Sequence, residues 1–259
     1  MKKPLLIILA VILTAALVFS YYQLWRYFSA EKETEEQFTD LTEQIETPSP
    51  TLPEHSNEEP PPEWTVTDQY GALFDQNPDM IGLIKIDGTT IDYPVMQTPD
   101  RPDFYLKHNF EKQWSDYGVP YAAEACSIDP QGDNVTVYGH HMKSGKMFGI
   151  LESYKSKDFY LEHPIIQFDT RAGFERYEII AVFKVSPAAF KYNEFISAAD
   201  QAEFDEYVSR CTALSFYDTG LTASYGDKLI SLSTCEYSAN NNRLVVVARK
   251  IEEGGAPSG

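Results

Sequence analysis

Three side chains that could together support nucleophilic catalysis stand where apolar runs begin or end. Cys235 follows the run 229–234, His140 follows the run 135–139, and Arg243 opens a third run. Strand ends are where a rigid element presents a side chain to a substrate. A thiol of ordinary pKa, about 8.5, is mostly protonated at neutral pH and needs a base or cation beside it to become an effective nucleophile. The pattern makes Cys235 the candidate nucleophile.

The two partners of this thiol have different expected roles. His140 supplies an imidazole that can move protons, and Gly139 before it permits a close backbone approach. His141 is adjacent, and in an extended chain its side chain faces the opposite way, so only one of the two should meet Cys235. Arg243 can return beside Cys235 across the loop 236–242, where its cation could bind an oxyanion or hold the substrate backbone.

Each of these residues also has a structural interpretation. Cysteine is among the most buried residue types, and taken alone Cys235 would more often be structural than catalytic. A lone His is usually a hydrogen-bonded structural residue, and a lone Arg at a strand start is usually solvated. For Cys126, in a predicted strand, and Cys211, on the apolar stripe of a helix, burial is the favoured interpretation. A disulfide between these two stays open, because sequence alone does not define pairing. With three cysteines in all, at least one thiol is unpaired or pairs between molecules.

Other chemistries have weaker support. A metal site built from His140, His141, His163 and Cys235 lacks the usual C-x-x-C or H-x-x-x-H spacing. Glycine-rich phosphate loops and a G-x-S-x-G turn are also missing from the sequence. We therefore expect no cofactor and no metal.

Composition bounds the class of protein. A chain of 259 residues has room for one domain of ordinary size and an appendage. The formal net charge is −18, and the sequence has no Lys/Arg cluster that could bind phosphates, so we expect no nucleic acid partner. Much of the acidity is local: residues 31–63 hold eleven acidic side chains against the single basic Lys32.

The N-terminus predicts a membrane anchor. Residues 4–20 carry no charge and would span roughly 26 Å as a helix, and the ring-rich residues 21–28 would continue it through the membrane interface. Lys2 and Lys3 then stay cytoplasmic and the rest lies outside the cell. A cleaved signal peptide shares the basic start but lacks a clear cleavage site here, and a soluble core helix would need a polar face.

Four further segments complete this organisation. Residues 29–63 are acidic and proline-rich and predict an unpacked stalk. Residues 64–251 predict the catalytic domain, and residues 252–259 a flexible tail. Residues 1–3 form the cytoplasmic N-terminus that precedes the anchor, residues 4–28.

The periodicity of the globular part predicts mostly β structure. A short helix opens it and stops at Asn77-Pro78, and a hairpin forms around the turn Asp87-Gly88. With short strands, two later helices and no parallel βαβ alternation, a mostly antiparallel barrel or sandwich is favoured. The remaining strands are predicted at 134–138, 165–169, 176–185, 228–234 and 243–251, and the later helices at 147–154 and 198–211.

Three of these segments, taken in order, resemble the catalytic segments of class B sortases. They are Val-Tyr-Gly-His-His-Met at 137–142, Leu-Ser-Thr-Cys-Glu at 232–236 and Asn-Arg-Leu-Val-Val-Val at 242–247. The similarity extends over about residues 73–250. The resemblance implies an eight-stranded sortase β-barrel with a short N-terminal helix and a helix, here 198–211, inserted before the last strands.

The resemblance also implies an activity. Cys235 would attack the Thr carbonyl of an NPxTx or [SNP]PxTG-type sorting signal near the C-terminus of a secreted protein, and His140 would protonate the leaving amine. A peptidoglycan peptide amine would then take the acyl group from the thioester. Arg243 would stabilise the oxyanion or orient the signal, and Ser233 and Glu236 would belong to the substrate groove.

Alternatives with the same three residues remain open at this stage. Water could resolve the thioester, which would make the protein a hydrolytic cysteine endopeptidase. A pilin lysine could be the acceptor, which would make it a pilin-polymerising sortase. The stalk and the aromatic richness are also compatible with a non-enzymatic surface adhesin.

Overall fold

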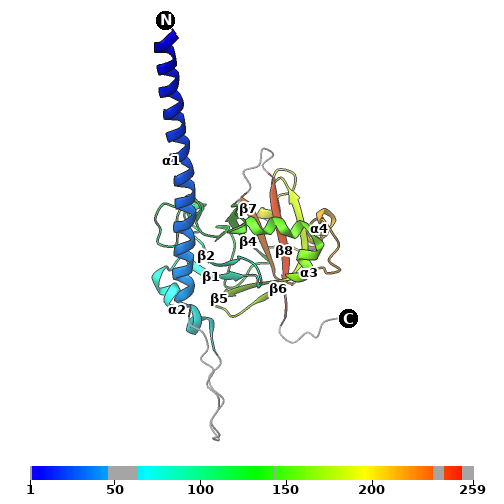
Figure 1. Ribbon diagram of the computed structural model, residues 1–259. Helices are drawn as coiled ribbons and strands as arrows, with labels where there is room; N and C mark the ends of the chain where they lie inside the picture. The colour runs from blue at the N-terminus through cyan, green and yellow to red at the C-terminus, as the bar shows by residue number, and fades with distance from the viewer. Residues whose placement is uncertain (1, 46–63, 143, 236–241, 253–259) are drawn as a thin grey trace.

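A computed structural model describes residues 2–45, 64–142, 144–235 and 242–252 of the chain. Its elements form a β-barrel with one long helix lying along its side (Figure 1). In chain order the helices are α1 (Lys2–Glu43), α2 (Val66–Gln76), η1 (Phe104–Leu106), η2 (Phe148–Lys155), α3 (Lys157–Glu162), η3 (Tyr192–Glu194) and α4 (Gln201–Leu214). The strands are β1 (Met80–Lys85), β2 (Asp92–Met96), β3 (Tyr121–Ala122), β4 (Asn134–His140), β5 (Ile165–Thr170), β6 (Arg176–Val185), β7 (Leu229–Cys235) and β8 (Arg243–Lys250).

The eight strands close into a barrel in the order β1-β2-β3-β4-β7-β8-β6-β5. Most neighbours are antiparallel, but β4 and β7 are parallel, as are β2 and β3. The predicted barrel is confirmed, including every strand expected after residue 130. The two-residue strand β3 was not predicted, because so short a pairing leaves no periodicity in the sequence.

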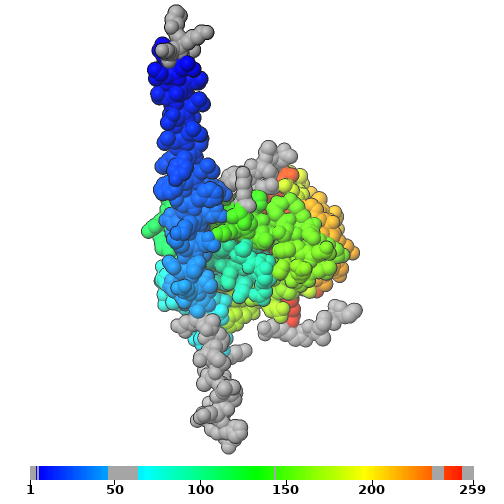
Figure 2. Space-filling model, viewed as in Figure 1, coloured from blue at the N-terminus to red at the C-terminus, as the bar shows by residue number. Residues whose placement is uncertain are grey.

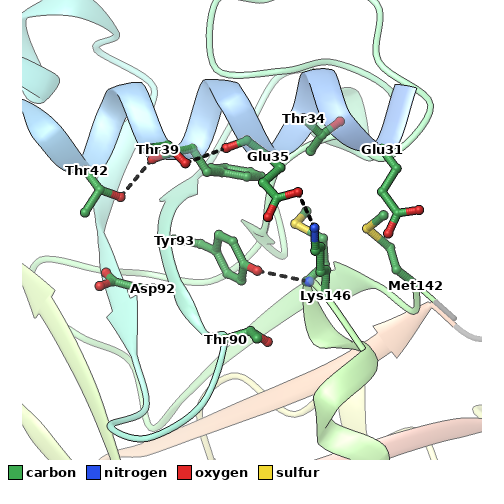
Figure 3. Close-up of a pocket in the computed structure, with 12 residues that line it drawn as sticks. Glu31, Thr34, Glu35, Thr39, Thr42, Thr90, Asp92, Tyr93, Met142 and Lys146 are labelled. Carbon is green, nitrogen blue, oxygen red and sulfur yellow. Dashed lines mark hydrogen bonds and ion pairs between the residues drawn. The ribbon is translucent and has the colours of Figure 1, made fainter. Parts of the chain in front are cut away.

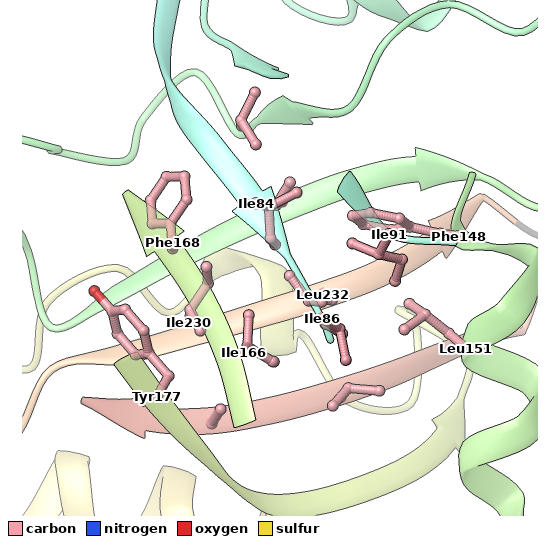
Figure 4. Packing of buried hydrophobic residues seen from close by; sticks show 14 of the residues in the cluster. Ile84, Ile86, Ile91, Phe148, Leu151, Ile166, Phe168, Tyr177, Ile230 and Leu232 are labelled. Atoms are coloured by element: carbon pink, nitrogen blue, oxygen red, sulfur yellow. The ribbon is translucent and has the colours of Figure 1, made fainter. Parts of the chain in front are cut away.

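The barrel interior is filled by apolar side chains from almost every strand (Figure 4). Ile84, Ile230 and Leu232 are completely buried there, and Phe148 and Leu151 enter from η2 to close one end. Close packing of this kind makes a truncation expensive: replacing one such Leu or Ile by Ala typically costs about 2–5 kcal/mol. The strand ends therefore project from a rigid frame.

The hairpin around Gly88 forms, but with a longer connection than the sequence indicated. β1 and β2 pair from Lys85↔Asp92 onward, so six residues separate them instead of two. Gly88 has φ +76°, as expected for a glycine turn, and Thr89 N donates to Ile86 O at 3.2 Å. Asp87 keeps a negative φ, which excludes the two-residue turn that needs both central residues at positive φ.

Two helices pack where their apolar faces predicted. In α2, a capping box between Thr65 and Asp68 begins the helix, and Asn77 ends it before Pro78. α4 runs from Gln201, a few residues later than expected, because Asp200 caps its first turn by accepting from Glu203 N at 3.0 Å. Its buried residues, Phe204, Tyr207, Val208 and Cys211, lie in one cluster with the outward side chains of β6 and β8.

The long helix α1 departs from the expected stalk. Residues 29–43 continue the helix without a break, although the sequence predicted an unpacked segment from residue 29. Their apolar side chains find a partner surface: Leu41 is 4% exposed, and Phe38 packs its ring against Tyr93 with centroids 4.8 Å apart. These two contacts were not predicted, because Phe38 and Leu41 are isolated apolar residues in an acidic segment. Residues 46–63 of the predicted stalk lie outside the described residues.

Candidate active site

His140 and Cys235 are brought together by the parallel pairing of β4 and β7. The register runs without a shift from Asn134↔Leu229 to His140↔Cys235, which is the last pair of both strands. Because the strands are parallel, their carboxyl ends lie at the same rim of the barrel. The backbones of the two residues are thus neighbours across one ladder step, about 5 Å apart in a sheet.

Arg243 begins β8 at this same rim. β7 and β8 are antiparallel with Ser233↔Val245 as the last pair in the register, and Leu244 N donates to Thr234 Oγ1 at 3.2 Å. The same register, continued by two residues, brings Arg243 opposite Cys235. We call the rim formed by His140, Cys235 and Arg243 the catalytic edge. The side chain of Cys235 lies outside the described part of the structure.

Gly139 explains how β4 ends so close to the helix η2. A Cβ added at this glycine would lie 2.5 Å from Cγ of Phe148, which is completely buried and cannot move aside. The phenyl ring therefore rests directly on the backbone of the residue before His140. This contact agrees with the expectation from the sequence that Gly139 permits a close backbone approach beside His140.

The His140 side chain is only 6% exposed. Burial, helped by the nearby cation of Lys107, lowers the pKa of its imidazole to about 4, while Asp116 acts in the opposite direction. The ring is therefore neutral at neutral pH. A neutral imidazole has one unprotonated ring nitrogen that can accept a proton.

A cavity of about 540 Å³ opens beside His140. Its walls come from three parts of the chain: the end of β4, the segment 107–117 that precedes β3, and the helix α1. His141 also lines this cavity, although strand alternation predicted that it would face away from His140, because β4 has ended before His141 is reached. The lining residues are Gln23, Arg26, Tyr27, Ala30, Lys107, Asp116, Tyr117, His140, His141 and Met142.

Sequence reasoning missed the charged residues of this cavity. Lys107 donates to Asp116 O at 2.8 Å, and Arg26 of α1 approaches Asp116 Oδ2 at 3.4 Å. No motif or periodicity marks these residues in the sequence. The one available signal was the ring-rich stretch 21–28, which was interpreted as a membrane interface and not as a wall of the site.

The two candidate groove residues have different outcomes. Ser233 lies in β7 with a completely buried side chain, and its Oγ is 2.7 Å from the hydroxyl of Tyr192. The Ser233 hydroxyl is therefore hydrogen-bonded to Tyr192 and is not exposed at the surface of the barrel. Glu236 lies outside the described residues.

The other two cysteines are free and buried, as the structural interpretation predicted. Cys211 is completely buried on α4, and this burial raises the pKa of its thiol to about 12. Burial also raises the pKa of Cys126. The predicted strand at Cys126 is wrong: the residue lies in a turn after β3, where its sulfur accepts from Thr136 N at 3.4 Å. Neither thiol is suited to act as a nucleophile.

The weak metal interpretation loses one of its ligands. His163 ends α3, and its Nδ1 lies 2.8 Å from Asp87 O in the β1–β2 connection. Among the residues that the structure describes, no three His, Cys, Asp or Glu side chains are grouped as metal ligands.

A closed eight-stranded barrel with histidine, cysteine and arginine at one rim defines a class of protein. The family model described as the sortase domain matches residues 84–251, and the chain belongs to this family of cysteine transpeptidases. Within the family it is a class B sortase. It is 31% identical to sortase B of Listeria monocytogenes over 188 residues, which are 72% of this chain and 75% of that protein.

Solved structures agree with this assignment. The Staphylococcus aureus sortase B–substrate complex superimposes with a TM-score of 0.68 at 28% identity, covering 73% of this chain and 87% of that one. A crystal structure of sortase B complexed with triglycine gives a TM-score of 0.67, also at 28% identity, and covers 73% of this chain and 87% of that chain. The predicted fold and the predicted class of enzyme are both confirmed.

Proposed function

We propose that this sortase cleaves a C-terminal sorting signal after Thr and transfers the acyl group through a Cys235 thioester to an amino group of peptidoglycan. The carrying observation is the His140↔Cys235 pairing at the end of two parallel strands. The similarity to a sortase B that binds a substrate and to one that binds triglycine supports a peptide donor and an amine acceptor. The proposed donors are secreted proteins with an NPxTx or [SNP]PxTG-type signal.

In the first half of the reaction, the neutral His140 imidazole takes the proton of the Cys235 thiol, and the sulfur adds to the Thr carbonyl. As the tetrahedral intermediate collapses, the C–N bond breaks and His140 gives its proton to the leaving amine. The product is an acyl-thioester on Cys235. In the second half, His140 removes a proton from the incoming amine, which attacks the thioester. The new amide leaves and the thiol recovers its proton.

Arg243 is proposed to stabilise the oxyanion of both tetrahedral intermediates. A guanidinium stays charged throughout and offers a planar fork of donors, so its field acts where negative charge develops. Its position opposite Cys235 in the β7–β8 register supports this role. Ser233 is proposed to support the groove from below, and Glu236 to line it.

We further propose that α1 anchors the enzyme in the cell membrane by a single pass, with the N-terminus cytoplasmic and residues 64–251 outside the cell as the catalytic domain. α1 is long and apolar enough to cross a bilayer, with a mean hydropathy of 2.1 over its most apolar window, none of which is buried in the protein. In this arrangement residues 4–28 form the anchor, residues 29–63 the connection to the domain and residues 252–259 a tail.

Product analysis tests the transferase proposal. The full-length enzyme is incubated with a sorting-signal peptide, with and without triglycine, and the products are identified by mass spectrometry. We expect a thioester on Cys235 and an amide between the Thr carbonyl and triglycine. Hydrolysed peptide alone at saturating triglycine would instead identify a cysteine endopeptidase. An amide formed only with a lysine side chain of a pilin-like peptide would identify a pilin-polymerising enzyme.

A further inference from the structure

α1 reaches the barrel at the point where its apolar segment ends. Residues 4–25 carry no charged side chain, and at the helical rise they span about 33 Å, close to the hydrocarbon thickness of a bilayer. Arg26 is the first charge after them, and it contacts Asp116 of the barrel at 3.4 Å. The next residue, Tyr27, meets Tyr117 edge to face with centroids 6.2 Å apart. The apolar segment therefore passes directly into the part of the helix that contacts the barrel.

Further contacts with the barrel follow along the helix toward its C-terminal end. Glu35 pairs with Lys146 (Figure 3). Phe38, three residues further along the helix, packs against Tyr93. Leu41 is buried in the apolar cluster that contains the buried face of α2 and the start of β1. We call this line of contacts, from Arg26 to Leu41, the seam. Ion pairs at such exposed positions contribute little, about 0–1 kcal/mol each, so the apolar contacts of Phe38 and Leu41 carry most of its stability.

The His140 part of the catalytic edge lies beside the N-terminal end of the seam. Gln23, Arg26 and Tyr27 of α1 line the same cavity as His140. Figure 2 shows the N-terminal part of α1 projecting beyond the barrel, with the rest of the helix lying against its side. The imidazole therefore lies beside the first turns that follow the apolar segment.

Trp114 is an exposed side chain close in sequence to the Arg26–Asp116 contact. It is the most exposed large apolar side chain of the described barrel, at 69%, and it lies two residues before Asp116. Its segment is held in place, because Ser115 N donates to Lys107 O at 2.9 Å and the Trp114 ring meets the His108 ring with centroids 5.9 Å apart. An exposed tryptophan is unfavourable in water but suited to the head-group layer of a membrane.

We propose that the seam holds the catalytic edge at the bilayer surface, and that Trp114 enters the head-group layer as a second membrane contact. The partner is a lipid surface, which continues the surface already occupied by the apolar part of α1. This inference rests on the proposed membrane anchor. It implies that the active site opens where membrane-retained substrates emerge.

Tryptophan quenching tests the arrangement, because the chain has only Trp25, Trp64 and Trp114. Two full-length variants each keep one reporter: Trp25→Phe/Trp64→Phe reports on Trp114, and Trp64→Phe/Trp114→Phe reports on Trp25. Both are reconstituted in vesicles of phosphatidylcholine and phosphatidylglycerol, with or without bromine on the upper acyl chain. We expect the bromolipid to lower the emission of both reporters, Trp114 by about twofold, as for an interfacial ring.

The outcomes separate the two proposals. An unquenched Trp25 would overturn the anchor, whereas a quenched Trp25 with an unquenched Trp114 would overturn only the present inference. Adding Phe38→Asp places a charge in the apolar seam, and it should abolish Trp114 quenching while leaving Trp25 quenched. Lys32→Gln is the matched control, since Lys32 pairs with Glu36 on α1 itself. If Phe38→Asp left Trp114 quenching unchanged in a variant with a normal melting curve, the role of the seam would be wrong.

Discussion

The catalytic edge and the seam are held by different kinds of interaction. The edge is set by backbone ladders between buried strands, β4 with β7 and β7 with β8, over an interior of packed apolar side chains. The seam depends on two apolar side chains, one edge-to-face ring contact and two exposed ion pairs along one helix. The first arrangement cannot shift without unfolding the barrel. The second has fewer buried contacts, so we expect it to contribute less to the stability of the folded chain.

Removing the nucleophile should have the largest effect. Cys235→Ala leaves the ladder intact but removes the sulfur, and we expect transpeptidation to fall by about 10³-fold or more. Cys126→Ala is the matched control, because its thiol is buried in a turn and should leave the rate near that of the wild type. Both rates are measured by mass spectrometry of the product. Wild-type turnover in Cys235→Ala would remove the basis of the mechanism.

Changing the cation should have the next largest effect. We expect Arg243→Ala to lower kcat by about 10²- to 10³-fold, as for the loss of an oxyanion donor. Arg243→Lys keeps the charge but loses the planar fork, so it should recover only a small part of this rate. Arg249→Lys, at the other end of β8 beside Glu178, is the control and should retain activity. A fully active Arg243→Lys enzyme would contradict the oxyanion role.

Acid should destabilise the edge through His140. The unfolded chain protonates this residue below about pH 6.5, but the folded chain does so only near pH 4, because burial lowers the pKa of the imidazole. Between these values acid favours the unfolded chain, by up to about 3 kcal/mol. His140→Asn cannot titrate, so its free energy of unfolding should fall less between pH 7 and pH 4. Parallel urea titrations of both proteins at the two pH values measure the difference.

Gly139→Ala should disturb the edge by a smaller amount. Its Cβ would overlap the Phe148 ring, and we expect the variant to lose about 1–3 kcal/mol of stability and to show a lower kcat. Gly71→Ala in α2 is the matched control. Its new Cβ would have only an ordinary 3.8 Å contact with Thr67, so this variant should be unchanged or slightly more stable. Equal melting temperatures for the two variants would contradict the role of the Phe148 contact.

The smallest effect should come from the polar part of the seam. Lys146→Ala removes the pair with Glu35, and we expect a change below about 1 kcal/mol in the free energy of unfolding and no change in kcat on a soluble peptide. Phe38→Ala removes apolar contact and should cost more. A larger loss in Lys146→Ala would mean that charge, and not apolar packing, holds the helix.

The sequence predicted the barrel better than it predicted the seam. The reason is that the barrel is built from continuous strand patterns, whereas the seam depends on single side chains whose partners are distant in the sequence. The strand β6 carries a long, mostly apolar run that can be recognised from the local sequence alone. Its bounds, Arg176–Val185, were therefore predicted without error. The edge was found because strand ends, a glycine and chemically active residue types coincide there. Phe38 and Leu41 are isolated apolar residues in an acidic segment, and their partners lie far along the chain. The influence of Lys107 and Asp116 on His140 could not be predicted, because only the fold brings these residues near the imidazole.

The helices before and after residues 46–63, α1 and α2, both pack on the barrel. Ile45 packs against the cluster that contains α2, and Gln76 at the end of α2 donates to Gln44 at the end of α1. The C-terminal ends of α1 and α2 are therefore fixed to each other as well as to the barrel. With α1 as the proposed anchor, the contacts of α1 with the barrel, and not the length of the connection between the two helices, would set the distance of the enzyme from the bilayer.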